Sequence, residues 1–412
     1  MIRPTRATIA TDALRRNLAA IRSRLAPETR VMGVVKANCY GHGVEICVPA
    51  LEAEGIDIFG VATISEAEQL RRNGVAGRIV LLTTPCEAEA ESIVALDLEP
   101  FISDVESATW LAAAARRHAR ALRVHLYVDT GMTRNGCDPG DAGRILAALS
   151  EEEGLVIQGI ASHFATSEED DHTYAVRQHS IFDGLLRELK DAGRTFEDVH
   201  IANSGGIFNH RASHHTLVRP GLSLYGYHPH PDLQASSGLA PVMSIRSIIS
   251  SVRSVAKGSS ISYGRRYTTS RDTRIATLPI GYGDGYPRLL TNRASVLIGG
   301  VRYPVVGTIC MDEIMVDLGP ESRAVVGDAV ILLGADGDER IDAWELASTI
   351  GTIPYEITTG IAHRVPRVRD EESASDIIDG AAETTGTDAP QTSMREAETT
   401  DETSRVHQRP TA

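Results

Sequence analysis

Eight short apolar runs, separated by amphipathic or polar segments, constrain the fold of this chain more than any other feature. Continuous rather than alternating hydrophobicity is typical of strands that a parallel sheet buries on both faces. Eight strand and helix units in about 215 residues predict a (β/α)8 barrel of the TIM type, and a doubly wound open sheet is the competing fold. The runs are VMGVVK (31–36), IFGVAT (58–63), IVLLT (79–83), LEPFIS (98–103), VHLYVDT (124–130), VIQGIAS (156–162), VHIANS (199–204) and LVRPGLSLYG (217–226).

Local signals also predict where two helices begin or end. Ser65 and Glu68 in SEAEQLRRNG (65–74) have the spacing of a capping box, and Gly74 supplies a helix stop. Asp342 is placed to cap a helix that extends to Ile350.

The chain changes character after the last apolar run of the barrel. Strand patterns separated by Gly, Pro and Asp turns predict a mostly antiparallel β domain. The predicted strands lie in VMSIRSIISSVRSV, RIATLPIGYG, ASVLIGG, VRYPVVGTI, EIMVDLG and AVILLG. We expect an N-terminal strand in residues 1–10 that associates with the β domain, the barrel in 11–235, the β domain in 236–369 and a tail in 370–412.

Acidic residues gather at the C-terminal end of the chain. Residues 370–412 contain 11 acidic and 3 basic residues and no Leu, Phe, Trp or Tyr. Such a segment buries too little apolar surface to offset its chain entropy, so we predict a disordered acidic tail. The whole chain has a net charge of −14, which argues against nucleic acid or an anionic membrane as a partner.

Cysteine usage and hydropathy bear on the compartment. Five cysteines without a CxxC pair disfavour both a disulfide framework and a cysteine-rich zinc site. No signal-peptide core and no run of 18 apolar residues is present. We expect a soluble, cytoplasmic protein without a metal site. The excess of Arg over Lys is compatible with salt adaptation or with biased codon usage.

Lys36 lies in the most informative motif, KANCYGHG (36–43), directly after the first apolar run. Residues at the carboxyl ends of barrel strands face the catalytic mouth. The chain contains only three lysines among its 41 basic residues, so a lysine at this position favours a functional role. It could neutralise a phosphate, act as a base or form an imine with a carbonyl group, and residue type alone leaves these three open.

Other polar residues occupy equivalent strand ends, and together they predict a functional rim. They are Asp129, Arg134, His163, His200, Asn203, Ser204 and Arg219. Gly221 would expose backbone N–H groups, and with Ser204 and Tyr40 it could bind a phosphate, which barrels often place after strands seven and eight. The chain has no GxGxxG, Walker, HExxH or GxSxG motif, so dinucleotide, P-loop, zincin and hydrolase functions lose their main support.

These residues belong to phrases that resemble alanine racemase, a fold-type III pyridoxal-phosphate enzyme, over residues 1 to about 369. The phrases are VVKANCYGHG (34–43), VHLYVDTGMTRNG (124–136), ASHFATS (161–167), HIANSGG (200–206), VRPGLSLYG (218–226), SYGRRYT (262–268), IGYGDGYPR (280–288), GTICMDE (307–313) and PYEI (354–357). The resemblance implies a racemase that interconverts L-alanine and D-alanine and supplies D-alanine for cell-wall synthesis.

The resemblance also implies two catalytic bases. Lys36 would hold pyridoxal 5'-phosphate covalently and act as one base, and Tyr263 from the second subunit of a homodimer would be the other. Two bases are needed because racemisation removes the α-proton from one face and returns a proton to the opposite face. A tyrosine must be stabilised as a phenolate to work near neutral pH, and the resemblance assigns that task to His163, itself linked to Arg219.

Further binding roles follow from the same resemblance. Arg219 would hydrogen-bond the pyridine nitrogen and, because it stays protonated, would make the cofactor a weaker electron sink. The substrate carboxylate would be held by Arg134 and the partner subunit's Met311, with Asp312 beside them. The cofactor phosphate would be held by Tyr40, Ser204, Gly221, Leu222 and Tyr355.

Tyr127 departs from the family pattern. Many members have a lysine there that becomes carbamylated and steadies the arginine equivalent to Arg134. A phenol cannot carry a carbamate, so we expect a less rigid Arg134 and a raised KM for alanine.

Other functions remain as alternatives. One is racemisation of another small amino acid such as serine, because the mechanism is indifferent to the side chain. Another is a non-catalytic pyridoxal-phosphate carrier on the same barrel. That carrier lacks a β domain and a counterpart of Tyr263, and the motifs also fit a decarboxylase of this barrel type poorly.

Overall fold

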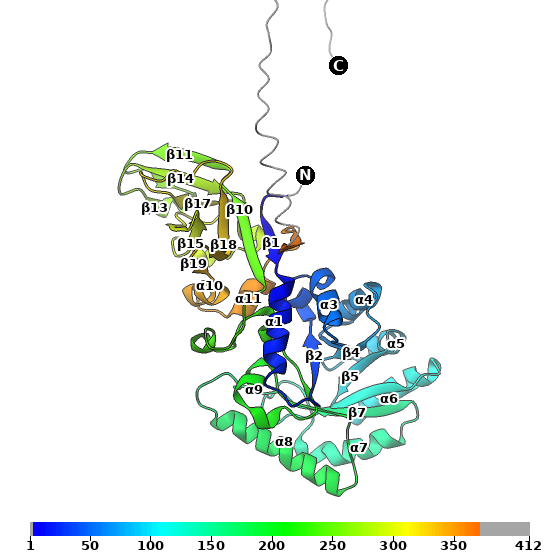
Figure 1. Cartoon of the computed structure of the whole chain (residues 1–412). Coiled ribbons are helices and arrows are strands. Elements are labelled where there is room, and N and C mark those ends of the chain that lie inside the picture. Colours follow the sequence, from blue (N-terminus) through cyan, green and yellow to red (C-terminus); the bar gives the residue numbers. More distant parts are fainter. Residues whose placement is uncertain (1–2, 371–412) are drawn as a thin grey trace, which may run out of the picture. The chain divides into compact units, whose positions relative to one another are not determined.

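The computed structural model describes residues 3–370. An eight-stranded parallel sheet has the order β8-β7-β6-β5-β4-β3-β2-β9, and Figure 1 shows its strands β2, β4, β5 and β7 with the helices around them. Each of the eight apolar runs overlaps one strand, which confirms the predicted barrel. Backbone hydrogen bonds from Thr216 to Val199 (3.3 Å) and from Arg219 to Ala202 (2.9 Å) join the two end strands, so the sheet is nearly closed. The strands are β2 (Arg30–Val34), β3 (Ile58–Val61), β4 (Arg78–Leu81), β5 (Leu98–Ile102), β6 (Leu122–Tyr127), β7 (Leu155–Ala161), β8 (Asp198–His200) and β9 (Leu217–Val218).

Helices alternate with these strands and bury their apolar faces against the sheet. They are α1 (Thr11–Arg22), α2 (Lys36–Tyr40), α3 (Val44–Ala53), α4 (Ile64–Arg72), α5 (Ala90–Ala95), α6 (Val105–Arg117), α7 (Ala142–Glu151), α8 (Thr173–Asp191) and α9 (Ser204–Asn209). The predicted capping box on α4 was wrong by two residues. The helix begins at Ile64 and its box joins Thr63 to Glu66, because β3 already ends at Val61.

The barrel interior has an apolar layer in the middle of the sheet and a charged layer at the N-terminal ends of its strands. The apolar layer consists of Met32, Ile58, Val80, Phe101, Tyr127, Ala161 and Leu217. The charged layer, here called the barrel floor, consists of Arg30, Arg78, Glu99, Arg123 and Asp198. Arg78 pairs with both Glu99 (2.6 Å) and Asp198, so the two buried carboxylates are neutralised.

The second domain contains a seven-stranded sheet, a three-stranded sheet and a short hairpin. Pairing is antiparallel except between β1 and β20, and β1 therefore lies in this domain although it precedes the barrel. Asp342 caps α10 through Glu345 N–H (2.9 Å), as predicted. The elements are β1 (Arg6–Ile9), β10 (Met243–Ile248), β11 (Ser251–Val255), β12 (Ser260–Ile261), β13 (Tyr267–Thr268), β14 (Thr273–Leu278), β15 (Ser295–Ile298), β16 (Val301–Pro304), β17 (Ile314–Asp317), β18 (Ala329–Asp336), β19 (Glu339–Ile341), α10 (Ala343–Ile350), α11 (Pro354–Thr359) and β20 (Arg367–Arg369).

The two domains contact each other near the carboxyl ends of the barrel strands. Asn17 on α1 donates to the carbonyl oxygen of Ala240 (2.9 Å), in the segment that leads to β10. Arg367 on β20 donates to the Gly41 carbonyl oxygen (2.9 Å). Helix α11 contacts α2 at the mouth of the barrel. No helix within residues 3–370 is both long and apolar enough to cross a membrane. The predicted acidic tail, apart from Asp370, lies outside the described residues.

Candidate active site

Lys36 stands at the carboxyl end of β2, and the backbone after it makes an unusual turn. Ala37, Asn38, Cys39 and Tyr40 all have φ between 51° and 55°, so α2 is a left-handed turn. This conformation costs about 1–2 kcal/mol for each residue that is not glycine. Strain of this kind persists only where surrounding contacts hold it in place.

Three contacts hold this turn. The Ala37 N–H donates to Oε1 of Glu66 (2.7 Å), and the Asn38 side chain accepts a backbone N–H from the start of α3 (2.9 Å). A Cβ on Gly41 would lie 2.0 Å from the carbonyl oxygen of Thr358, so the turn packs directly on α11. Glu66 was not identified from the sequence, although its capping-box spacing from Thr63, just after β3, was an available signal.

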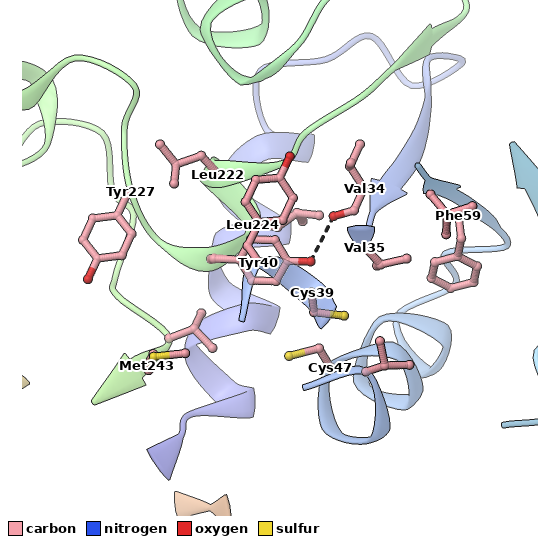
Figure 2. Packing of buried hydrophobic residues seen from close by; sticks show 14 of the residues in the cluster. Val34, Val35, Cys39, Tyr40, Cys47, Phe59, Leu222, Leu224, Tyr227 and Met243 are labelled. Carbon is pink, nitrogen blue, oxygen red and sulfur yellow. Dashed lines mark hydrogen bonds between the residues drawn. The ribbon is translucent and has the colours of Figure 1, made fainter. Parts of the chain in front are cut away.

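A cavity of about 140 Å³ opens at this end of the barrel. It brings together all eight residues to which the sequence assigned cofactor contacts, and it adds Val34, Leu82 and Asn203. The eight are Lys36, Tyr40, His163, Ser204, Arg219, Gly221, Leu222 and Tyr355. Figure 2 shows Tyr40 among buried apolar side chains, with Val34 and Leu222.

One end of the cavity is rich in hydrogen-bond donors. The Ser204 hydroxyl oxygen accepts the N–H groups of Gly221 (3.1 Å) and Ser223 (3.2 Å). A Cβ on Gly221 would lie 2.3 Å from the Tyr40 hydroxyl oxygen, so only glycine permits this approach. Burial raises the pKa of Tyr40 and of Tyr355, which keeps both phenols protonated as donors. This corner suits an oxyanion such as a phosphate.

The other end of the cavity is cationic. Burial, followed by the charges of Arg134 and Arg219, lowers the pKa of Lys36, although Glu66 opposes the shift. Burial and the charge of Arg219 lower the pKa of His163 well below its ordinary value. The amine is therefore easier to deprotonate than an exposed lysine, and the imidazole is neutral at physiological pH.

Arg219 is fixed by hydrogen bonds on both sides. One guanidinium nitrogen donates to Nδ1 of His163 (3.0 Å), and the other donates to Nδ1 of His200 (2.7 Å). Burial lowers the pKa of Arg219 to about 10, so the group is still charged at neutral pH. Because a guanidinium only donates, both histidine Nδ1 atoms must accept, and their protons lie on Nε2.

A line of hydrogen bonds continues from His200 through the barrel to its floor. His200 Nε2 faces Nδ1 of His125 (3.1 Å), and His125 Nε2 faces Oε2 of Glu99 (3.0 Å). Although burial opposes ionisation, hydrogen bonds from Arg78 and His125 lower the pKa of Glu99. Each histidine thus accepts on its Nδ1 side and donates on its Nε2 side, from Arg219 to a carboxylate. Sequence reasoning noted His200 but missed His125 and Glu99.

Arg134 lies near this cavity without lining it. It follows β6 in an exposed loop, and its charge lowers the pKa of Lys36, His163 and Arg219. Within residues 3–370 no hydrogen bond or ion pair involves its guanidinium. The side chain is therefore close to the cavity but not fixed by a neighbour.

Tyr263 and Met311 lie elsewhere, in a hollow on the second domain that we call the β-domain hollow. Its lining residues are Tyr263, Tyr282, Arg288, Thr308, Ile309, Cys310, Met311, Asp312 and Glu313. Tyr263 is 74% exposed and Met311 is 53% exposed. The structure therefore does not bring these two residues to Lys36 within one chain.

The β-domain hollow is nevertheless built by specific contacts. The Tyr263 carbonyl oxygen accepts from Thr308 Oγ1 (2.6 Å). Arg364 binds the carbonyl oxygen of Met311 (3.1 Å) and pairs with Asp312 (2.8 Å). Nothing in the sequence pattern singled out Arg364.

Comparison with known proteins agrees with this geometry. Residues 9–229 match the family described as alanine racemase, N-terminal domain, and residues 242–369 match alanine racemase, C-terminal domain. An alanine racemase of Symbiobacterium thermophilum is 41% identical over 374 residues, which cover 90% of this chain and 99% of the relative.

Solved structures give the same result. The alanine racemase from D-cycloserine-producing Streptomyces lavendulae has a TM-score of 0.84 and 37% identity, over 90% of this chain and 97% of that one. The alanine racemase of Bartonella henselae with covalently bound pyridoxal phosphate has a TM-score of 0.80 and 31% identity, over 89% of this chain and 99% of that one. Since both family domains match in order and together span most of residues 3–370, the chain belongs to the alanine racemase family.

Proposed function

We propose that this chain is a pyridoxal-phosphate-dependent alanine racemase that interconverts L-alanine and D-alanine and so supplies D-alanine for the cell wall. The observation that carries the proposal is the cavity at the carboxyl ends of the barrel strands. It combines a half-buried lysine, an oxyanion corner and a fixed arginine. The family membership and the two-domain match support the same activity.

The residues present fit pyridoxal phosphate. The oxyanion corner would bind the phosphate through the Gly221 and Leu222 N–H groups and the hydroxyls of Tyr40, Ser204 and Tyr355. The close approach of Tyr40 to Gly221, which a Cβ would prevent, supports this assignment. Arg219 would donate to the pyridine nitrogen. The cofactor, when bound, supplies an electron sink that acidifies the α-proton of an attached amino acid.

The protein's own groups would move the protons. Lys36 has the lowered pKa of an amine that can attack a carbonyl and then act as a base. Arg219 stays protonated at neutral pH and would not transfer a proton to the pyridine nitrogen. After one base removes the α-proton, a proton would therefore be returned to the α-carbon. His163, which accepts from Arg219 on Nδ1, would direct its Nε2–H towards the second base.

The second base would be Tyr263 of the partner subunit in a homodimer. The β-domain hollow supports this, because an exposed cluster of large apolar side chains marks an interaction surface. Tyr263, Tyr282 and Met311 are 74%, 42% and 53% exposed in the single chain. The partner subunit's Met311 would approach the substrate carboxylate, with Arg134 on the other side.

An isotope experiment on wild type and Lys36→Ala tests the activity. Purified wild type should show an imine absorption band, become irreversibly labelled by borohydride, and transfer deuterium from heavy water to the α-carbon of alanine. Lys36→Ala should do none of these. Wild-type protein that takes up no pyridoxal phosphate, or that leaves alanine unlabelled, would overturn the proposal.

A hybrid dimer tests the shared active site. Lys36→Ala and Tyr263→Phe chains are co-expressed with different tags, and the dimer that carries both tags is isolated. If Lys36 and Tyr263 of opposite subunits form each site, the dimer that carries both tags has one intact site and should have about half of wild-type activity. If both bases came from one chain, the hybrid would be inactive.

A further inference from the structure

Away from the active site, two histidines and one carboxylate converge between α8 and the segment that leads into β9. His179 and Asp183 lie one turn apart on α8, and His215 lies two residues before β9. Nε2 of His179 is 3.7 Å from Oδ1 of Asp183, and Nε2 of His215 is 3.8 Å from the same oxygen. The three atoms all lie within 4.8 Å of one another.

These separations are too long for hydrogen bonds, which join such atoms at about 2.7–3.2 Å. Both Nε2 atoms are nevertheless buried, and neither has a hydrogen-bond partner among residues 3–370. Buried polar atoms in proteins normally have a partner. The geometry therefore leaves two unpartnered ring nitrogens and one carboxylate oxygen within 4.8 Å of one another.

The cluster is also reachable from solvent. Asp183 is 40% exposed, so an ion can enter from solvent and keep a water ligand.

A second cluster in the barrel shows what a satisfied set looks like. Glu99, His125 and Asp198 also lie within 4.8 Å of one another. Their carboxylates already bind Arg78, and Nε2 of His125 is 3.0 Å from Glu99. That cluster has no free ligand atoms, whereas His179 and His215 each offer one.

We propose that His179, Asp183 and His215 bind a divalent transition metal ion, with Zn²⁺ as the natural occupant. Two nitrogens and one carboxylate oxygen suit Zn²⁺, whereas Ca²⁺ and Mg²⁺ prefer oxygen ligands alone. Tetrahedral zinc with bonds of about 2.0–2.1 Å places its ligands about 3.3 Å apart, so small side-chain rotations close the site. The ion would tie α8 to the segment that carries β9 and Arg219, and this site was not expected from the sequence.

Zinc titration of the tag-free holoenzyme tests the site. After treatment with a chelator, wild type should bind one equivalent of Zn²⁺ in calorimetry, Co²⁺ should give the visible spectrum of a four-coordinate ion, and Zn²⁺ should raise the unfolding temperature. His179→Gln and Asp183→Asn should each weaken zinc binding at least about 100-fold, since even partners of the ligands are worth about 10–100-fold.

His172→Gln is the matched control, because His172 is an exposed histidine at the start of the same helix. It should bind zinc as wild type does. Racemisation without zinc should be unchanged in all three variants, so the outcome is separate from that of the proposed function. Absence of zinc binding in wild type, or equal affinity in wild type and the His179 and Asp183 variants, would overturn the proposal.

Discussion

The barrel mouth and the β-domain hollow would form the two faces of one active site, yet they differ in almost every physical respect. The side chains of the mouth are buried or half-buried and hold one another. Arg219, for example, makes hydrogen bonds to both His163 and His200. The hollow is open, and the side chain of Tyr263 is 74% exposed. A face that its own chain completes can be interpreted from one subunit, whereas the proposed role of the other face requires a second copy of the chain.

The largest effect is expected for Lys36→Ala. This change removes both the covalent anchor and one base, so we expect kcat to fall by more than about 10⁴-fold. Initial rates of D-alanine formation measure it. Lys257→Ala, which alters an exposed lysine of the second domain, is the matched control and should keep wild-type rates. Comparable losses in both variants would show that activity depends on Lys36 no more than on an exposed lysine.

Tyr263→Phe tests the open face. Loss of one proton-transfer group costs about 10²–10⁴-fold in rate, so kcat should fall within that range. The variant should still exchange the α-proton of one enantiomer with heavy water, since Lys36 remains. Tyr282→Phe changes a half-exposed tyrosine of the same hollow and should keep a kcat close to that of wild type. Equal exchange of both enantiomers in Tyr263→Phe would contradict a two-base site.

Glu99→Gln tests how far the order of the mouth depends on the barrel floor. It removes the buried carboxylate that Arg78 and Arg123 share, although Arg78 keeps Asp198, and should lower the free energy of unfolding by about 3–5 kcal/mol. The pKa of Glu99 is lowered in the folded state, so its contribution is present above the ordinary pKa and is lost as pH falls through the folded value. Denaturant melts from pH 7 downwards measure both effects.

Glu152→Gln is the reference for Glu99→Gln, because Glu152 pairs with Arg116 at the surface (3.3 Å). Such pairs contribute about 0–1 kcal/mol. If the two variants lose equal stability, the buried layer has no special role.

Gly221→Ala tests the oxyanion corner. A Cβ there would lie 2.3 Å from the Tyr40 hydroxyl oxygen, and the neighbouring donors must move. We expect the affinity for pyridoxal phosphate to fall by about 10²-fold, as measured by dialysis and reconstitution, because the phosphate loses aligned donors. Gly143→Ala places a Cβ in open space on α7 and should bind the cofactor normally. If both variants retain pyridoxal phosphate as wild type does, the oxyanion corner does not bind the phosphate.

The fold was largely predictable because its signals are local. Eight apolar runs overlap eight strands, and the Asp342 cap begins α10 where its spacing indicated. The mouth residues were predictable for the same reason, since parallel strands deliver their carboxyl ends to one rim. The sequence was therefore enough to name every residue that lines the cavity with Lys36, apart from Val34 and Leu82.

What could not be predicted depends on register or on close packing. The line from Arg219 to Glu99 requires β5, β6 and β8 to align their inward residues, which periodicity does not fix. The left-handed turn at Ala37 depends on Glu66 and on the approach of α11. The cluster of His179, Asp183 and His215 joins residues from α8 and a loop that have no shared motif. The proposed role of Tyr263 requires a second chain, which no pattern within one chain positions.

The smallest effect concerns Tyr127, at the boundary between fixed and free parts of the mouth. Tyr127 is buried and stacks on Phe101, with ring centroids 4.8 Å apart, while Arg134 has no hydrogen bond within residues 3–370. Tyr127→Lys restores the residue that many family members carbamylate. In bicarbonate, we expect KM for alanine to fall about 5-fold, which corresponds to about 1 kcal/mol of better positioning of Arg134.

Without bicarbonate, the same lysine would instead add an uncompensated cation near Arg134 and Arg219, so KM should not improve. Tyr127→Phe keeps the stacking on Phe101 and removes a hydroxyl that has no hydrogen bond within residues 3–370, so its KM should match wild type in both buffers. Steady-state kinetics with and without bicarbonate distinguish these cases. If KM and kcat of Tyr127→Lys equal those of wild type in both buffers, the Arg134 side chain is already well positioned in wild type, even though it makes no hydrogen bond within residues 3–370.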